Sequence, residues 1–154
     1  MVKLGRWCPK VLNFTPMFFI YHLFVFLNMM NLLIWNARGV GGKAFVPLLL
    51  ELRKKYGFQF LAILEPKQKR EKAEWLRRRL GFAEMDVVKV RGLGGGIWCF
   101  WESETGFRVL GKYDQVLHGV FNGGRHDEWG LSVVYGEPNF MRRQNLWVYL
   151  RKVE

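Results

Sequence analysis

The feature that most constrains the fold is the alternation of short apolar runs with helical patterns in the first half of the chain. Asn31 to Asn36 and Phe58 to Leu64 are apolar runs bounded by polar or glycine-rich residues, which predicts two buried strands. Lys43 to Tyr56 and Gln68 to Leu80 carry apolar residues at helical spacing, and a glycine follows each segment. The order strand, helix, strand, helix predicts α/β architecture.

The second half of the chain has a different pattern, with short β runs separated by glycine-rich or polar turns. The predicted strands are Met85–Val90, Ile97–Trp101, Phe107–Leu110, Val116–Phe121 and Leu131–Tyr135. Such spacing predicts antiparallel hairpins. Phe140 to Val153 follows as a predicted amphipathic helix with Leu146, Tyr149 and Leu150 on one side. We therefore expect an α/β fold in which mixed sheets are flanked by helices.

Composition bounds the class of protein without fixing its partner. The 154 residues are 50% hydrophobic, which is enough for one globular core. The formal net charge of +11 favours polyanions, either nucleic acid or an anionic membrane face. Cys8 and Cys99 are the only cysteines, too few for a zinc site. They fit a reducing, intracellular setting, with the nucleus among the options, and nothing in the sequence sets the oligomeric state.

The first 29 residues stand apart from the rest. Residues 17–35 are uncharged and largely apolar, and basic residues precede them, which is the outline of a signal peptide or membrane anchor. His22, Asn28 and Asn31 interrupt this run, and the 11 residues from Met17 to Leu27 fall short of the roughly 20 that cross a bilayer. We predict that residues 1–29 are an extension that a domain over residues 30–154 does not require. A membrane anchor through 17–35 and a packed helix stay as alternatives.

Four motifs occur in order along the chain. They are WNARG at Trp35 to Gly39, LEPK at Leu64 to Lys67, GLGGGIWCFW at Gly92 to Trp101, and VYGEP at Val134 to Pro138, with RRxxLW at Arg142 to Trp147 after the last. In this order the motifs resemble the endonuclease domain of plant LINE-type (non-LTR) retrotransposons, which belongs to the endonuclease/exonuclease/phosphatase superfamily. The resemblance covers nearly everything from residue 31 to residue 154.

The resemblance implies a two-sheet α/β sandwich that hydrolyses a phosphodiester with Mg²⁺ held at the mouth between the sheets. By motif, Asn36 would contact the metal or the scissile phosphate, Glu65 would ligate Mg²⁺, and Tyr135 would contact the phosphate. The residues themselves agree, because Asn36 and Glu65 each end a predicted buried strand, where ligand sites of such sheets gather. Both also offer the hard oxygen ligands that Mg²⁺ prefers.

Four basic residues near these motifs are candidate contacts to nucleic acid. Arg38 and Lys67 lie inside the first two motifs, and Arg142 and Arg143 follow the last one. Lys67 also begins a basic stretch, Lys67 to Arg79, which either follows a phosphate backbone or forms an ordinary solvated helix face.

The sequence departs from the family in ways that bear on activity. Pro66 stands where the family has a hydroxyl residue after the metal-binding Glu, and Gly94 stands where it has Ser. The family's Gly-Asp-Phe-Asn and Ser-Asp-His segments have no counterpart before Glu154, and neither His118 nor His126 has the flanking residues of the family's histidine. We therefore expect an incomplete sandwich and a truncated, inactive phosphodiesterase. The alternatives are a basic nucleic-acid-binding module without chemistry and a membrane-anchored protein.

Overall fold

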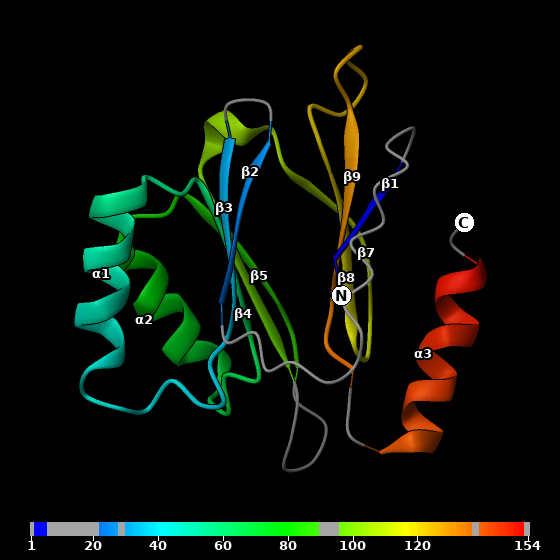
Figure 1. The fold of residues 1–154 in the computed structure, drawn as a ribbon, viewed down its shortest axis with the longest axis horizontal. Helices are drawn as coiled ribbons and strands as arrows, with labels where there is room; N and C mark the ends of the chain where they lie inside the picture. The colour runs from blue at the N-terminus through cyan, green and yellow to red at the C-terminus, as the bar shows by residue number, and fades with distance from the viewer. Residues whose placement is uncertain (1, 6–21, 28–29, 90–95, 137–138, 153–154) are drawn as a thin grey trace.

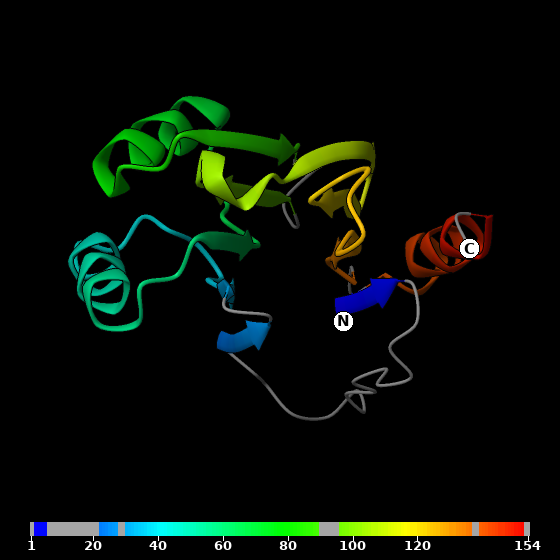
Figure 2. The ribbon, with the colours of Figure 1, turned by 90° about the horizontal axis from the view of Figure 1, so that it is seen from above.

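The computed structural model describes residues 2–5, 22–27, 30–89, 96–136 and 139–152. Two β-sheets face each other, and helices cover their outer sides (Figures 1 and 2). The predicted α/β class is thus confirmed. Three parts of the chain discussed in the sequence lie outside the described residues: the glycine-rich turn at residues 92–95, Glu137 and Pro138 of the fourth motif, and residues 17–21 of the apolar run.

The first sheet has five strands in the order β2-β3-β4-β6-β5. Their bounds are His22–Leu27 for β2, Met30–Asn36 for β3, Phe60–Leu64 for β4, Glu84–Val88 for β5 and Ile97–Trp101 for β6. The β3 and β4 strands are parallel, as the strand–helix–strand order predicts, and β6 and β5 add an antiparallel hairpin.

The second sheet has four antiparallel strands in the order β1-β9-β8-β7. Their bounds are Val2–Gly5 for β1, Arg108–Tyr113 for β7, Val116–Phe121 for β8 and Trp129–Val134 for β9. The β7 strand runs past its predicted end at Leu110, because a register shift between Val109 and Gly111 lets it keep pairing with β8. Two parts of residues 1–29 thus pair with the sheets, β1 with β9 and β2 with β3.

Three helices cover the outer faces of the sheets (Figure 1): α1 is Phe45–Tyr56, α2 is Arg70–Leu80 and α3 is Phe140–Lys152. The α1 and α2 helices end at Gly57 and Gly81, whose φ angles of 57° and 77° are left-handed. Glycine reaches these angles at little cost, which explains why both helices end at the predicted residues. Among the described residues, no helix is both long and apolar enough to span a membrane.

The core has three layers because the strand residues alternate between two faces. On β4, Phe60 and Ala62 face the second sheet, whereas Leu61 and Ile63 pack with the residues under α1 and α2. Buried residues of α2 are Ala73, Leu76 and Leu80, apolar residues at the helical spacing on which this helix was predicted. The α3 helix packs on the outer face of the second sheet against Val116 and Val134. The helix residues in this contact are Leu146, Leu150 and Tyr149, the three that were predicted to share one side.

Aromatic side chains fill the space between the two sheets. The ring of Phe60 lies 4.9 Å from that of Phe107 and 5.5 Å from that of Phe121, centroid to centroid. An ion pair between Lys112 on β7 and Asp86 on β5, 2.8 Å long, also joins the sheets. These contacts hold the two sheets in one position relative to each other.

Candidate functional site

The candidate site begins where the parallel strands β3 and β4 end. Asn36 pairs in register with Leu64, so the loops that follow leave the sheet as neighbours. Backbone hydrogen bonds continue the pairing beyond the strands: the N–H groups of Ala37, Gly39 and Val40 donate to the carbonyl oxygens of Leu64, Glu65 and Pro66, over 3.0, 2.8 and 3.0 Å. The two loops are therefore held together by their main chains.

The same loops contain unusual backbone conformations. Arg38, Glu65 and Lys67 have φ angles of 47°, 55° and 53°, and Gly39 has a φ of 113°. Residues with a Cβ adopt positive φ at a cost of roughly 1 kcal/mol or more each, and in native structures such residues cluster at functional sites. The Glu65 N–H donates to the Gly96 carbonyl over 3.1 Å, so the hydrogen bonds around the loops offset this cost.

Four of the predicted site residues gather in these two loops. The Glu65 carboxylate forms an ion pair with the Lys67 ammonium, with Oε1 3.1 Å from Nζ. The Asn36 Oδ1 accepts a hydrogen bond from the Arg38 N–H over 3.3 Å. Glu65 and Asn36 are half-buried, whereas Arg38 and Lys67 are exposed. The loops therefore carry an amide oxygen, a carboxylate and two basic side chains.

Asn36 belongs to the inner face of the first sheet. Leu32 and Ile34 on the same strand pack in the core between the sheets, and side chains two residues apart lie on one face of a strand. The amide of Asn36 is thus placed at the end of the inter-sheet layer, in register with Leu64, which packs against that core.

Tyr135 lies at the same end of the sandwich. It directly follows β9, and β9 ends at the same end of the sandwich as β3 and β4 (the lower end in Figure 1). Its side chain is buried and belongs to the core between the sheets, and its N–H donates to the Gln115 carbonyl over 2.9 Å. Tyr135 therefore contributes to the packing that positions this end.

Arg142 and Arg143 lie in the first turn of α3, which starts at this end of the molecule (Figure 1). The Arg142 side chain is exposed and that of Arg143 is half-buried. The Gln115 amide donates to the Arg142 carbonyl over 2.9 Å, so buried Gln115 joins the backbone of Tyr135 to the helix. This role could not be predicted from the sequence, because a single Gln in a hairpin turn carries no local pattern.

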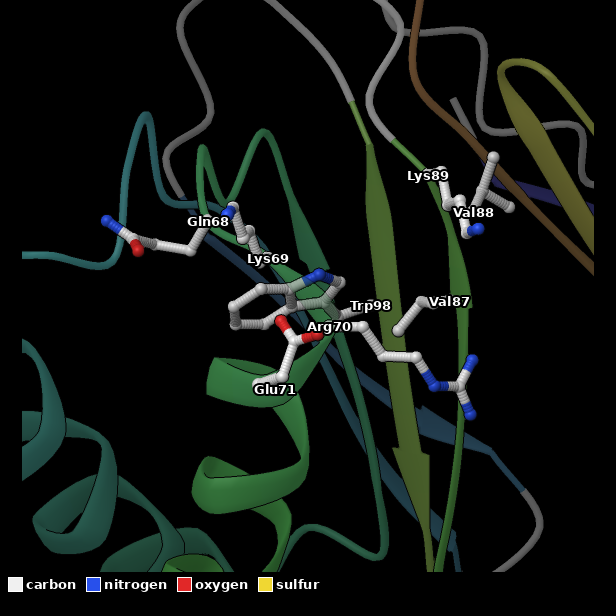
Figure 3. Close-up of a pocket in the computed structure, with 8 residues that line it drawn as sticks. All are labelled: Gln68, Lys69, Arg70, Glu71, Val87, Val88, Lys89 and Trp98. Atoms are coloured by element: carbon white, nitrogen blue, oxygen red, sulfur yellow. The ribbon is translucent and has the colours of Figure 1, made fainter.

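A pocket of about 350 Å³ lies beside the first turn of α2, a few residues beyond Lys67 (Figure 3). It is lined by Gln68, Lys69, Arg70, Glu71, Val87, Val88, Lys89 and Trp98. Valine and indole groups form its apolar part, and its charged residues are three cations and one carboxylate. The pocket therefore extends the positive character of the Lys67 region toward β5 and β6.

Part of the basic stretch from Lys67 to Arg79 has structural partners. The Arg77 guanidinium donates to the carbonyl oxygens of Phe82 and Ala83 over 2.8 and 2.9 Å, which secures the end of α2. Arg70 forms an ion pair with Glu74 over 3.1 Å. Arg78 and Arg79 are exposed.

The two histidines discussed above lie away from Asn36 and Glu65. His118 is buried on β8 under α3, where its Nδ1 is 2.7 Å from the Ser132 hydroxyl and its ring stacks on Tyr149. Burial lowers the pKa of His118 below its usual value. His126 is exposed in the turn between β8 and β9, at the opposite end of the sandwich (Figure 1).

Among the described residues, no three His, Cys, Asp or Glu side chains gather closely enough to hold a metal ion. At the Asn36 end, the side-chain oxygens described above belong to the Asn36 amide and the Glu65 carboxylate. In comparisons with known proteins, no protein-family model matches the chain, and no curated protein matches it.

Proposed function

We propose that these 154 residues form the N-terminal portion of a Mg²⁺-dependent endonuclease/exonuclease/phosphatase-type domain, of the kind that plant LINE-type retrotransposons carry. By themselves they bind nucleic acid and do not cleave it. One observation carries the proposal: Asn36 and Glu65 come from neighbouring parallel strands, whose loops are joined by backbone hydrogen bonds. The basic residues Arg38, Lys67, Arg142 and Arg143 lie at the same end and supply the contacts to phosphate.

The donor set suits a hard cation. Mg²⁺ commonly takes one or two carboxylates and fills its other positions with water and phosphate oxygens, so the Glu65 carboxylate and the Asn36 amide would hold it together with a bound phosphate. When bound, the ion supplies polarisation of a phosphoryl oxygen. Lys67 must leave the Glu65 carboxylate for this to happen, because its ammonium lies 3.1 Å from Oε1. Released from Glu65, the same ammonium can contact the phosphate.

Turnover needs more than a cation and a phosphate contact. A general base and a general acid contribute about 10²–10⁴-fold each. Glu65 is paired with Lys67, Tyr135 is buried in the core, and the imidazoles of His118 and His126 lie elsewhere. We therefore expect no measurable hydrolysis by this chain.

A second candidate is nucleic-acid binding without any metal. The Glu65–Lys67 ion pair favours it, because Lys67 already neutralises the carboxylate that Mg²⁺ would use. In this case Glu65 only positions Lys67, and Arg38, Lys67, Arg142 and Arg143 form a cationic surface for the phosphate backbone.

Binding of a fluorescent DNA duplex, measured by anisotropy across a salt series with Mg²⁺ or EDTA, tests the proposal. Replacing Arg142 and Arg143 by Ala should lower the slope of log K against log salt by about 2, since each phosphate contact contributes about 0.9. The matched control replaces Arg78 and Arg79 by Ala, which removes the same charge from exposed positions at the far end of α2. An equal loss in both double variants would show that only net charge matters.

The variant Glu65→Gln distinguishes the metal-dependent candidate function from the metal-free one. If Mg²⁺ binds there, Mg²⁺ strengthens DNA binding by the wild-type protein, and Glu65→Gln abolishes that gain. If no metal binds, wild-type and Glu65→Gln proteins respond alike to EDTA. A supercoiled-plasmid nicking assay completes the test: nicking that requires Mg²⁺ and disappears in Glu65→Ala would overturn the expectation of no cleavage. Absence of DNA binding at low salt would overturn both candidates.

A further inference from the structure

The α3 helix is apolar on two opposite sides. Leu146, Tyr149 and Leu150 pack inward on the second sheet. The large apolar side chains that remain exposed on this helix are Phe140, Met141, Trp147 and Val148. At 100° per residue these four fall within an arc of about 120°, roughly opposite the inward residues. We call these four residues the outer face of α3.

This outer face has no packing role in the part of the chain that the structure describes. The α3 helix is the outermost element on its side of the sandwich in both views (Figures 1 and 2). A surface helix needs one apolar stripe to pack on its sheet, and a second one leaves large side chains in water. Large exposed apolar residues that gather on one side of a helix in this way mark interaction surfaces.

The charge on α3 selects among the surfaces that could cover it. The segment from Phe140 to Lys152 contains three arginines and one lysine and no acidic residue, within a chain of net charge +11. A second copy would bring an equally positive helix, so like charges would oppose self-association. The complementary surface is both apolar and anionic, which describes the headgroup region of an anionic bilayer.

The length of the helix sets its orientation on such a surface. The 13 residues of α3 span about 20 Å, less than the roughly 30 Å of bilayer hydrocarbon. A helix of this length therefore lies parallel to the membrane plane. Tryptophan and phenylalanine are well suited to that interface, since their rings tolerate the boundary between headgroups and acyl chains.

We propose that the outer face of α3 binds the surface of an anionic lipid bilayer. Phe140, Met141, Trp147 and Val148 enter the boundary between headgroups and acyl chains, and Arg151 contacts lipid phosphates. Binding is reversible and leaves the sandwich folded.

Co-sedimentation of the full 154-residue protein with vesicles tests this proposal. The vesicles contain phosphatidylcholine alone or mixed with phosphatidylserine, at low and at high salt. We expect binding to the anionic vesicles, of which a part resists high salt because it is apolar. The double variant Phe140→Gln and Trp147→Gln should bind about tenfold more weakly, since each ring loses the burial of its exposed part. Near-ultraviolet circular dichroism checks that each variant is folded.

Trp75 provides a matched control. It lies on α2, is 41% exposed compared with 43% for Trp147, and allows the same change to Gln without altering charge. Trp75→Gln should bind vesicles like the wild-type protein. Equal binding by the double variant and this control would show that attraction is purely electrostatic and would overturn the proposal. Failure to bind anionic vesicles, or a concentration-dependent dimer that Trp147→Gln abolishes in light scattering, would overturn it as well.

Discussion

Gly119 on β8 offers a sharp test of the packing that holds the two sheets together. A Cβ added at this position would lie 2.2 and 2.5 Å from the Cζ and Cε2 atoms of Phe107 and 2.8 Å from the Arg108 carbonyl oxygen. Side-chain carbons do not approach each other so closely, so the Phe107 ring or the backbone must move. Gly119→Ala therefore inserts a methyl group where the core has no space.

The Phe107 ring has little freedom to retreat. Its centroid lies 4.9 Å from those of Phe60 and Trp101 and 4.6 Å from that of Phe121. Overpacking of a dense core costs about 1–3 kcal/mol, and we expect Gly119→Ala to lie at the upper limit because a backbone oxygen is also in contact. For a chain of this size, a loss of about 3 kcal/mol lowers Tm by roughly 6–12 °C.

Urea denaturation followed by tryptophan fluorescence measures the free energy of unfolding. Gly111→Ala is the matched control: it lies on neighbouring β7, and its added Cβ would meet only the Tyr149 hydroxyl at an ordinary 3.8 Å. We expect this control to change stability by less than about 1 kcal/mol. Combining Gly119→Ala with Phe107→Leu should recover part of the loss. If Gly119→Ala costs no more than the control, the proposed contact does not limit packing.

Three further predictions concern the core and the N-terminus. Because the pKa of His118 is lowered in the folded protein, the unfolded chain binds its proton first, and the free energy of unfolding should fall as pH drops below about 6.5, by up to about 1.4 kcal/mol per pH unit. The variant His118→Gln should lose this pH dependence in urea titrations between pH 5 and pH 7. Burial, with a smaller contribution from Asp86, raises the pKa of the Cys99 thiol. In a Cys8→Ser background, Ellman's reagent should therefore react with Cys99 only after denaturant is added, and rapid reaction of the native protein would contradict this. Without the first 29 residues, residues 30–154 should still unfold cooperatively, but gel filtration should show more aggregation because β3 and β9 lose their partners β2 and β1. A non-cooperative unfolding transition would show that the domain needs this segment.

Local patterns were sufficient to predict much of the fold. The apolar runs at β3 and β4 are strands because each fills two layers of core, and Gly57 and Gly81 end their helices through left-handed φ angles. The parallel arrangement of β3 and β4 followed from the intervening helix, and with it the nearness of the ends that carry Asn36 and Glu65. These features depend on neighbouring residues, which is why the sequence reveals them.

Other features depend on contacts between distant segments. The positive φ angles of Glu65 and Lys67, and the ion pair between them, arise where the loop after β4 bonds to the loop after β3. The link that Gln115 makes between Tyr135 and α3 exists only once the second sheet and the helix have docked. The exposed outer face of α3 could not be predicted from hydrophobic periodicity either. Apolar residues on opposite sides of a helix contribute in opposite directions to the helical periodicity, so their signals nearly cancel.

The pairing of β1 with β9 has a consequence for synthesis on the ribosome. β2 can join β3 as soon as both have emerged, because two residues separate them, whereas Val2 must wait for Val133. Closing a loop of that length costs about 4 kcal/mol of chain entropy, which four paired residues can offset only after β9 is already in place. The β1 strand therefore leaves the ribosome before the other described strands and is expected to be among the last of them to be incorporated.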